Sequence, residues 1–170
     1  MEKAKKMKKF FSTRKLSIIA LLAIISFSFT SSESEVKYKC MIQMMNYTGE
    51  NAYVVISLIK PDGNYDKTLH MAGKDSEWYP DFIKWWGYQK KAKDKLDGIT
   101  GASIAGGQRS MSLIKVPATK IDKGYKLRFE SAVEGQSYHT KDVEFDLTTA
   151  NVNQKFDGKG YVRYVRLIPA

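Results

Sequence analysis

Short runs of β-forming residues, separated by turn residues, make up most of this chain from residue 36 onward. Turn signals recur about every 8–12 residues, which is the strand spacing of an all-β sandwich. The pattern predicts a mainly β fold, specifically an immunoglobulin-like β-sandwich. The seven expected strands are Val36–Asn46, Asn51–Lys60, Tyr65–His70, Ser110–Val116, Gly124–Val133, Tyr138–Leu147 and Gly160–Ile168.

Three turn segments indicate how neighbouring strands connect. Gly49-Glu50 lies between the first two runs and predicts a hairpin there. Pro61-Asp62-Gly63 is a strong turn signal between the second and third runs. Glu134–Ser137 predicts a hairpin between the fifth and sixth runs.

Two of the expected strands alternate apolar and charged side chains, which predicts one buried and one solvent-exposed face for each. The apolar positions are Leu127 and Phe129 in one strand and Val143, Phe145 and Leu147 in the other. The charged positions, expected to face water, are Lys126, Arg128, Glu130, Asp142, Glu144 and Asp146.

One aromatic segment, Ser76–Lys90, departs from the strand pattern and predicts a short helix. Asp75 or Ser76 would be its N-cap, and Pro80 would lie in the first turn. Trp78, Phe82 and Trp85 then share one helix face. These rings either close one end of the sandwich or flank a bound planar cofactor, and the pattern alone favours packing. A glycine-rich loop, Asp97–Gln108, follows.

The N-terminus has the layout of a secretory signal peptide. Residues 1–15 are basic and polar, Leu16–Phe29 is apolar, and small residues lead to Ser32. We expect cleavage after Ser32, leaving residues 33–170 as a single domain in the periplasm. An uncleaved, periplasm-facing anchor is the weaker interpretation, because this run of 14 residues, which includes three serines, falls short of the ~20 apolar residues that span a bilayer.

The charge distribution argues against nucleic-acid binding. The formal net charge is +10, but residues 1–32 hold seven basic residues and one acidic residue. The remaining 138 residues hold 21 basic and 17 acidic residues, a net charge of +4. Most of the basic excess therefore belongs to the predicted targeting segment, and no nucleic-acid partner is expected.

Most signatures of enzymatic chemistry are missing from the sequence. His70 and His139 lack metal-ligand spacing, and there is no nucleophile elbow or phosphate-binding loop. No carboxylate pair suggests acid–base catalysis. The single cysteine, Cys40, lies in an expected strand and is most simply a buried apolar residue.

The segment Asp97-Gly98-Ile99-Thr100-Gly101-Ala102-Ser103 resembles the target motif of FMN transferases, which attach FMN from FAD to the last hydroxyl and release AMP. By this resemblance Ser103 is the acceptor. Asp97 would hold the metal or orient the acceptor, and Thr100 would bond within the turn or to the phosphate. Gly98, Gly101 and Ala102 would leave room for phosphate oxygens to approach backbone N–H groups. An ordinary glycine-rich surface loop is the alternative.

Four segments carry a further resemblance, namely Tyr53–Leu69, Trp85-Trp86, Asp97–Ser103 and Gly124–Ala132. Through them the chain from Ala52 to Leu147 resembles the predicted periplasmic family called domain of unknown function 2271. The resemblance implies an immunoglobulin-like fold, a flavin-attachment motif and association with PepSY-type membrane redox proteins. The chain departs from the family in lacking a Trp-Asp-Gly segment within Met111–Lys123, and in having Ser103 where Thr is commoner.

The leading hypothesis is an exported flavoprotein that carries electrons through FMN joined to Ser103 by a phosphodiester, more an electron-transfer protein than a stand-alone enzyme. The implied partners are an FAD-dependent flavin transferase and a PepSY-type or other membrane redox protein. Trp85 and Trp86 are candidates for stacking on the flavin ring, with core packing favoured for at least one. A non-catalytic binding or scaffold module is the second hypothesis, and an enzyme with its own substrate is the third.

Overall fold

A computed structural model describes residues 34–170, so the predicted signal peptide and its cleavage site lie outside the described residues. Nine strands and one α-helix, with three short 3₁₀ segments, make up this part of the chain. The strands are β1 (Glu35–Met44), β2 (Tyr53–Ile59), β3 (Tyr65–Ala72), β4 (Thr100–Gly101), β5 (Arg109–Pro117), β6 (Lys126–Ala132), β7 (Tyr138–Asp146), β8 (Lys155–Asp157) and β9 (Val162–Pro169). The helical elements are η1 (Ser76–Asp81), α2 (Ile83–Ala92), η2 (Ala118–Lys120) and η3 (Thr149–Asn151).

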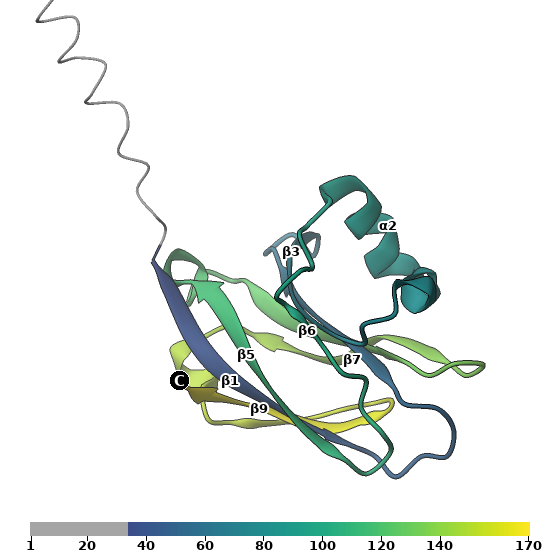
Figure 1. Cartoon of the computed structure of the whole chain (residues 1–170). Coiled ribbons are helices and arrows are strands. Elements are labelled where there is room, and N and C mark those ends of the chain that lie inside the picture. Colours follow the sequence, from purple (N-terminus) through teal and green to yellow (C-terminus); the bar gives the residue numbers. More distant parts are fainter. Residues whose placement is uncertain (1–33) are drawn as a thin grey trace, which may run out of the picture. The chain divides into compact units, whose positions relative to one another are not determined.

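The strands form two sheets that pack as a sandwich (Figure 1). The four-stranded sheet has the order β5-β1-β9-β8, and the five-stranded sheet has the order β4-β3-β2-β6-β7. All neighbours are antiparallel except β3 and β4. The predicted mainly β sandwich with one short helix is therefore confirmed.

Two of the three predicted connections are confirmed. Pro61-Asp62-Gly63 joins the paired strands β2 and β3, and Glu134–Ser137 joins β6 and β7. The hairpin predicted at Gly49-Glu50 is wrong, because β1 and β2 belong to different sheets. That connection carries the chain from one layer of the sandwich to the other.

The main core fills the space between the sheets with alternate side chains from both layers. Ile42, Ile56, Phe129 and Val165 are among its fully or almost fully buried members. Cys40 is also buried here, and its burial raises the pKa of the thiol to about 12. The predicted role of Cys40 as a buried apolar residue is thus confirmed.

A second core lies between the outer face of the five-stranded sheet and the helical segments η1 and α2 (Figure 1). Its buried members are Val55, Met71, Tyr79, Phe82, Trp85 and Ala132. This layer overturns part of the alternation-based prediction: Arg128 and Glu130 were expected to face water and are buried. Asp142 was also expected to face water, but it is buried for another reason, because its carboxylate accepts hydrogen bonds from the backbone N–H groups of Lys159, Gly160 and Val162.

The predicted single helix is in fact two segments. Pro80 lies inside the 3₁₀ segment η1, and Phe82, with φ −81° and ψ 62°, separates η1 from α2. Asp75 precedes η1 but makes no side-chain capping bond. The break changes the direction of the chain, so Trp78 and Trp85 do not share one continuous helix face.

Candidate functional site

The Asp97–Ser103 motif lies at the edge of the five-stranded sheet. A turn brings the Ile99 N–H to the Leu96 carbonyl, with an N···O distance of 3.0 Å. Thr100 and Gly101 then form β4, a two-residue strand beside β3 that sequence analysis missed. Immediately after Ser103, Ile104 pairs with Ala52 just before β2. Ser103 therefore lies where the chain passes the end of β3, held by backbone bonds on both sides.

Glycine suits positions 98 and 101 of the motif for two different structural reasons. Gly98 has φ +79°, a left-handed conformation that favours glycine, and a Cβ there would meet nothing within 4 Å. Gly101 has no such conformation, but a Cβ there would lie 3.3 Å from Cε1 and Nε2 of His70. Burial lowers the pKa of His70, and a hydrogen bond with the Ile99 backbone partly opposes this. A neutral imidazole is thus packed against the motif.

Ser103 lines two hollows, one on each side of the motif. Its side chain is half-buried, and its hydroxyl makes no hydrogen bond to any other residue in the described part of the chain. A serine hydroxyl that is accessible and not engaged in the fold is available for chemistry from outside. The structure thus leaves the predicted acceptor group open.

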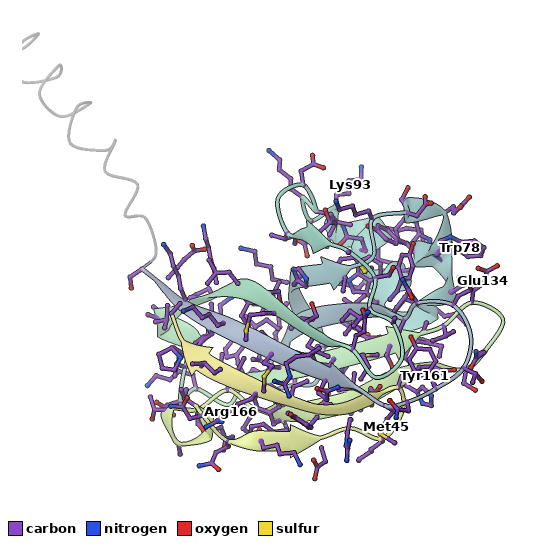
Figure 2. The ribbon with its side chains drawn as sticks, turned by 60° about the horizontal axis from the view of Figure 1, so that its bottom comes forward. Met45, Trp78, Lys93, Glu134, Tyr161 and Arg166 are labelled. Carbon is purple, nitrogen blue, oxygen red and sulfur yellow. The ribbon has the colours of Figure 1, made fainter. Side chains whose placement is uncertain are left out.

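The first hollow measures about 180 Å³ and lies at one end of the second core. Aromatic side chains form part of its wall and three carboxylates lie around it, with no lysine or arginine among its lining residues. Trp78 and Glu134, which both line this hollow, lie next to each other in Figure 2. The lining residues are Glu50, Asn51, Tyr53, Trp78, Asp81, Phe82, Ser103, Ala132, Val133 and Glu134.

The Tyr53 ring is held in this wall by close packing on the backbone. A Cβ on Gly73 would lie 1.9 Å from a ring carbon of Tyr53, so only glycine fits beneath the ring. Burial raises the pKa of the Tyr53 phenol, with smaller contributions from the charges of Asp75, Glu77 and Glu134. The phenol stays neutral and the wall is rigid.

The second hollow, of about 440 Å³, runs along the open side of the sandwich, between the motif and β5. Gly98–Ile104 form one wall, and residues 108–113 of the other sheet's edge form the opposite wall. Arg109 and His70 are the basic residues among those that line it. The Arg109 guanidinium, however, donates to Gln43 Oε1 of β1 at 3.1 Å and to the Tyr164 hydroxyl of β9 at 3.3 Å, so it points along the outer face of the four-stranded sheet and away from the motif. Carboxylates surround the first hollow, whereas small residues of the motif form one wall of the second.

The two predicted stacking candidates are not near Ser103 in this arrangement. Trp85 is 0% exposed, and its indole N–H donates to Thr68 Oγ1 at 3.0 Å. It is part of the second core and has no open ring face. Trp86 is half-buried against Tyr79 and Trp85 and lines neither hollow. Trp78, from the same aromatic segment, does line the first hollow.

The other motif residues lie either at the second hollow or at the turn that precedes it. Gly98, Thr100, Gly101 and Ala102 line the second hollow together with Ser103. Asp97 is exposed and lines neither hollow that Ser103 lines. The structure therefore brings the hydroxyl and the small residues together and leaves the Asp97 carboxylate at the turn.

A buried polar network beneath α2 was not predicted. Glu130 is 0% exposed and accepts hydrogen bonds from the hydroxyls of Tyr65, at 2.6 Å, and Tyr138. Burial raises the pKa of Glu130, while these hydrogen bonds and the Arg128 charge oppose the rise. Arg128 also donates to Glu144 at 2.5 Å. Because every polar group has a partner, the network explains how charged side chains are buried here.

A family model described as "Predicted periplasmic protein (DUF2271)" matches residues 35–164. The chain belongs to this family. The family match covers β1 to β8 and the first three residues of β9, as well as the motif and both hollows. Searches of curated proteins and of solved structures return no significant match.

Within residues 34–170, no helix is both long and apolar enough to cross a membrane. No group of three or more His, Cys, Asp or Glu side chains within the same range is arranged to hold a metal ion.

Proposed function

We propose that this DUF2271 protein is an exported electron carrier whose FMN is attached covalently to the hydroxyl of Ser103. The observation that carries the proposal is the state of that hydroxyl: it is accessible, makes no hydrogen bond within the described residues, and ends a motif held at a sheet edge. An acceptor in phosphoryl transfer needs this freedom, because the donor phosphate must approach in line with it.

The attachment step balances as a phosphodiester exchange. The Ser103 oxygen would form a bond to the flavin-side phosphorus of FAD, and the bond from that phosphorus to the bridging oxygen would break. AMP would leave, and the hydroxyl proton would pass to a base on the transferase. The residues around Ser103 fit this step, since Gly101 and Ala102 add little side-chain bulk on the approach.

The surroundings of Ser103 also suit the attached group. When bound, FMN supplies reversible uptake and release of electrons. The residues that would hold its phosphate are the small motif residues Gly98, Gly101 and Ala102, which line the second hollow beside Ser103. Its ring would lie toward the first hollow, against Trp78 and Tyr53, because carboxylates there disfavour the phosphate and aromatic walls favour a planar ring.

The first hollow is too small to enclose a flavin ring. Its volume of about 180 Å³ is below the roughly 300–1,000 Å³ of typical small-molecule clefts. A ring seated there would remain partly exposed, and a partner protein could approach it directly. We propose a membrane redox protein of the PepSY type as that partner and an FAD-dependent transferase as the modifying enzyme.

The proposal is tested by exporting the protein together with a flavin transferase and recording its visible spectrum after denaturation. We expect yellow colour that stays with the denatured chain, is lost in Ser103→Ala, and is kept in Ser103→Thr. Ser110→Ala, which removes another hydroxyl lining the second hollow, is the matched control and should stay yellow. A colourless wild-type chain, with a known target modified in parallel, would leave a non-catalytic binding module as the better account.

A further inference from the structure

The outer face of the four-stranded sheet is open, whereas the outer face of the other sheet is covered by η1 and α2 (Figure 1). We call its outward side chains the basic face. They are Glu35, Lys37, Lys39, Met41 and Gln43 of β1, Arg109, Met111, Leu113 and Lys115 of β5, Lys155 and Asp157 of β8, and Tyr164, Arg166 and Ile168 of β9. In Figure 2, Arg166 lies on the opposite side of the sandwich from Trp78 and Lys93.

The strand register arranges this face in rows. Lys37 lies directly opposite Lys115, and Arg166 lies directly opposite Lys155. Like charges at directly opposed positions destabilise a sheet. Two such pairs on one face therefore lower the stability of the folded state, and an anionic surface bound there would relieve this repulsion.

Few carboxylates compensate the basic face. Within residues 34–170, the ion pairs that involve it are Lys115 with Glu35 at 3.9 Å and Lys155 with Asp157 at 3.0 Å. Lys37, Lys39, Arg109 and Arg166 have no carboxylate partner in that range. The face holds six basic and two acidic side chains, a net charge of +4, which equals the net charge of residues 33–170.

Apolar side chains lie among these cations. Met111 is 53% exposed and Leu113 is 52% exposed, although both lie on a regular strand. Leu113 is directly opposite Lys39, and Met111 is directly opposite Met41. A flat surface with flexible apolar side chains surrounded by lysines and arginines suits lipid headgroups over an underlying acyl layer.

We infer that the basic face docks on an anionic phospholipid membrane surface. Charge complementarity is one argument for this occupant. The second is the pair of exposed apolar side chains, Met111 and Leu113, among the cations. An anionic bilayer offers both a negatively charged surface and an apolar layer beneath it.

Membrane docking of the basic face does not require flavin attachment, but it determines how close the Ser103 motif lies to the membrane. Met111 and Leu113 also line the second hollow, which holds the Ser103 motif. A domain that rests on its basic face would thus bring the motif close to the membrane surface, where a membrane redox partner is found.

The inference is tested by vesicle co-sedimentation of the exported chain. The vesicles are either equal parts phosphatidylglycerol and phosphatidylcholine or phosphatidylcholine alone. We expect binding to the anionic vesicles that weakens as salt rises, because counterions screen surface charges. Lys37→Gln with Lys115→Gln removes one opposed pair of cations and should lower the partition coefficient about 25-fold, at roughly fivefold per charge.

Lys90→Gln with Lys91→Gln is the matched control, since both residues are exposed on α2. It makes the same change in net charge and should alter the partition coefficient less than twofold. The variant with Lys37→Gln and Lys115→Gln removes a like-charge repulsion, so it should be folded under the assay conditions. A urea melt of this variant checks that unfolding is not the cause of a loss of binding. Every variant is prepared as residues 33–170, the domain expected after cleavage, so the apolar segment Leu16–Phe29 contributes nothing to vesicle binding.

Three results would overturn the inference. Equal binding to both vesicle types would show that charge is not the cause. An equal loss of binding in the two double variants would show that net charge, and not this face, is the cause. No binding to either vesicle type at low salt would exclude a phospholipid surface as the occupant of this face.

Discussion

Replacement of the two motif glycines by alanine separates two physical effects. At Gly101 the added Cβ would lie 3.3 Å from the His70 ring, a tight contact that costs about 1–3 kcal/mol when neighbours must shift. The alanine also restricts the unfolded chain, which returns about 0.4–1 kcal/mol. We therefore expect Gly101→Ala to lower the free energy of unfolding by about 1–2 kcal/mol. At Gly98 the space is open, and the φ of +79° costs about 1–2 kcal/mol for a residue with a Cβ.

The assay is a double-mutant cycle measured by urea unfolding. In a His70→Ala background the contact at position 101 is gone, so Gly101→Ala should become neutral or slightly stabilising. Gly98→Ala should cost the same in both backgrounds, because its penalty is a backbone conformation. An undiminished cost of Gly101→Ala without His70 would refute the argument that the imidazole requires glycine there.

Three other results are expected. Burial raises the pKa of the Glu130 carboxyl above its usual value of 4.5, so the folded state holds that proton to higher pH than the unfolded state does. As pH rises from about 4.5 through the folded pKa, wild type should therefore lose stability relative to Glu130→Gln. Urea unfolding at a series of pH values measures this difference. Cys40 is 0% exposed, with its pKa raised to about 12, so a thiol reagent should label it only in denaturant. Trp78→Ala should increase the fluorescence of attached flavin, whereas Trp86→Ala should not, as measured at equal flavin content.

Each of these results has an outcome that contradicts it. A pH-independent difference between wild type and Glu130→Gln would mean that the carboxyl does not change its protonation on folding. Rapid labelling of Cys40 in the native protein would contradict its burial. Equal fluorescence changes in the Trp78 and Trp86 variants would remove the argument that the flavin ring lies in the first hollow.

The strands were predictable because sandwich strands have a strong local signature. Alternation and turn residues located seven strands to within a few residues, and β7 (Tyr138–Asp146) was placed almost to its ends. The strands β4 and β8 contain two and three residues, too few to show any alternation. The turn residues Gly49-Glu50 did not show that β1 and β2 belong to different sheets, because a local turn signal does not say whether the chain continues in the same sheet.

The faces of the five-stranded sheet were harder to predict, for a physical reason. Alternation shows which side chains point into the main core, but it does not show whether another layer covers the opposite face. Glu130 is charged and yet buried, because tyrosine hydroxyls from β3 and β7 satisfy it beneath α2. Only the three-dimensional arrangement supplies those partners.

The candidate site was partly predictable. The motif indicated an accessible hydroxyl at Ser103, and the structure leaves it accessible. The aromatic residues beside it were not identified, because Trp78 and Trp85 look alike in a periodic pattern. The break at Phe82 separates them, placing Trp78 at the hollow and Trp85 in the core.

The central claim is that Ser103 carries the flavin, and peptide mass mapping of the protein exported with a flavin transferase tests it most directly. We predict that the peptide containing Ser103 gains the mass of FMN less one water, with fragment ions locating the gain on Ser103 and not on Thr100. The same peptide from Ser103→Ala should be unmodified. Unmodified wild-type peptide, or the mass gain on another residue, would contradict the account.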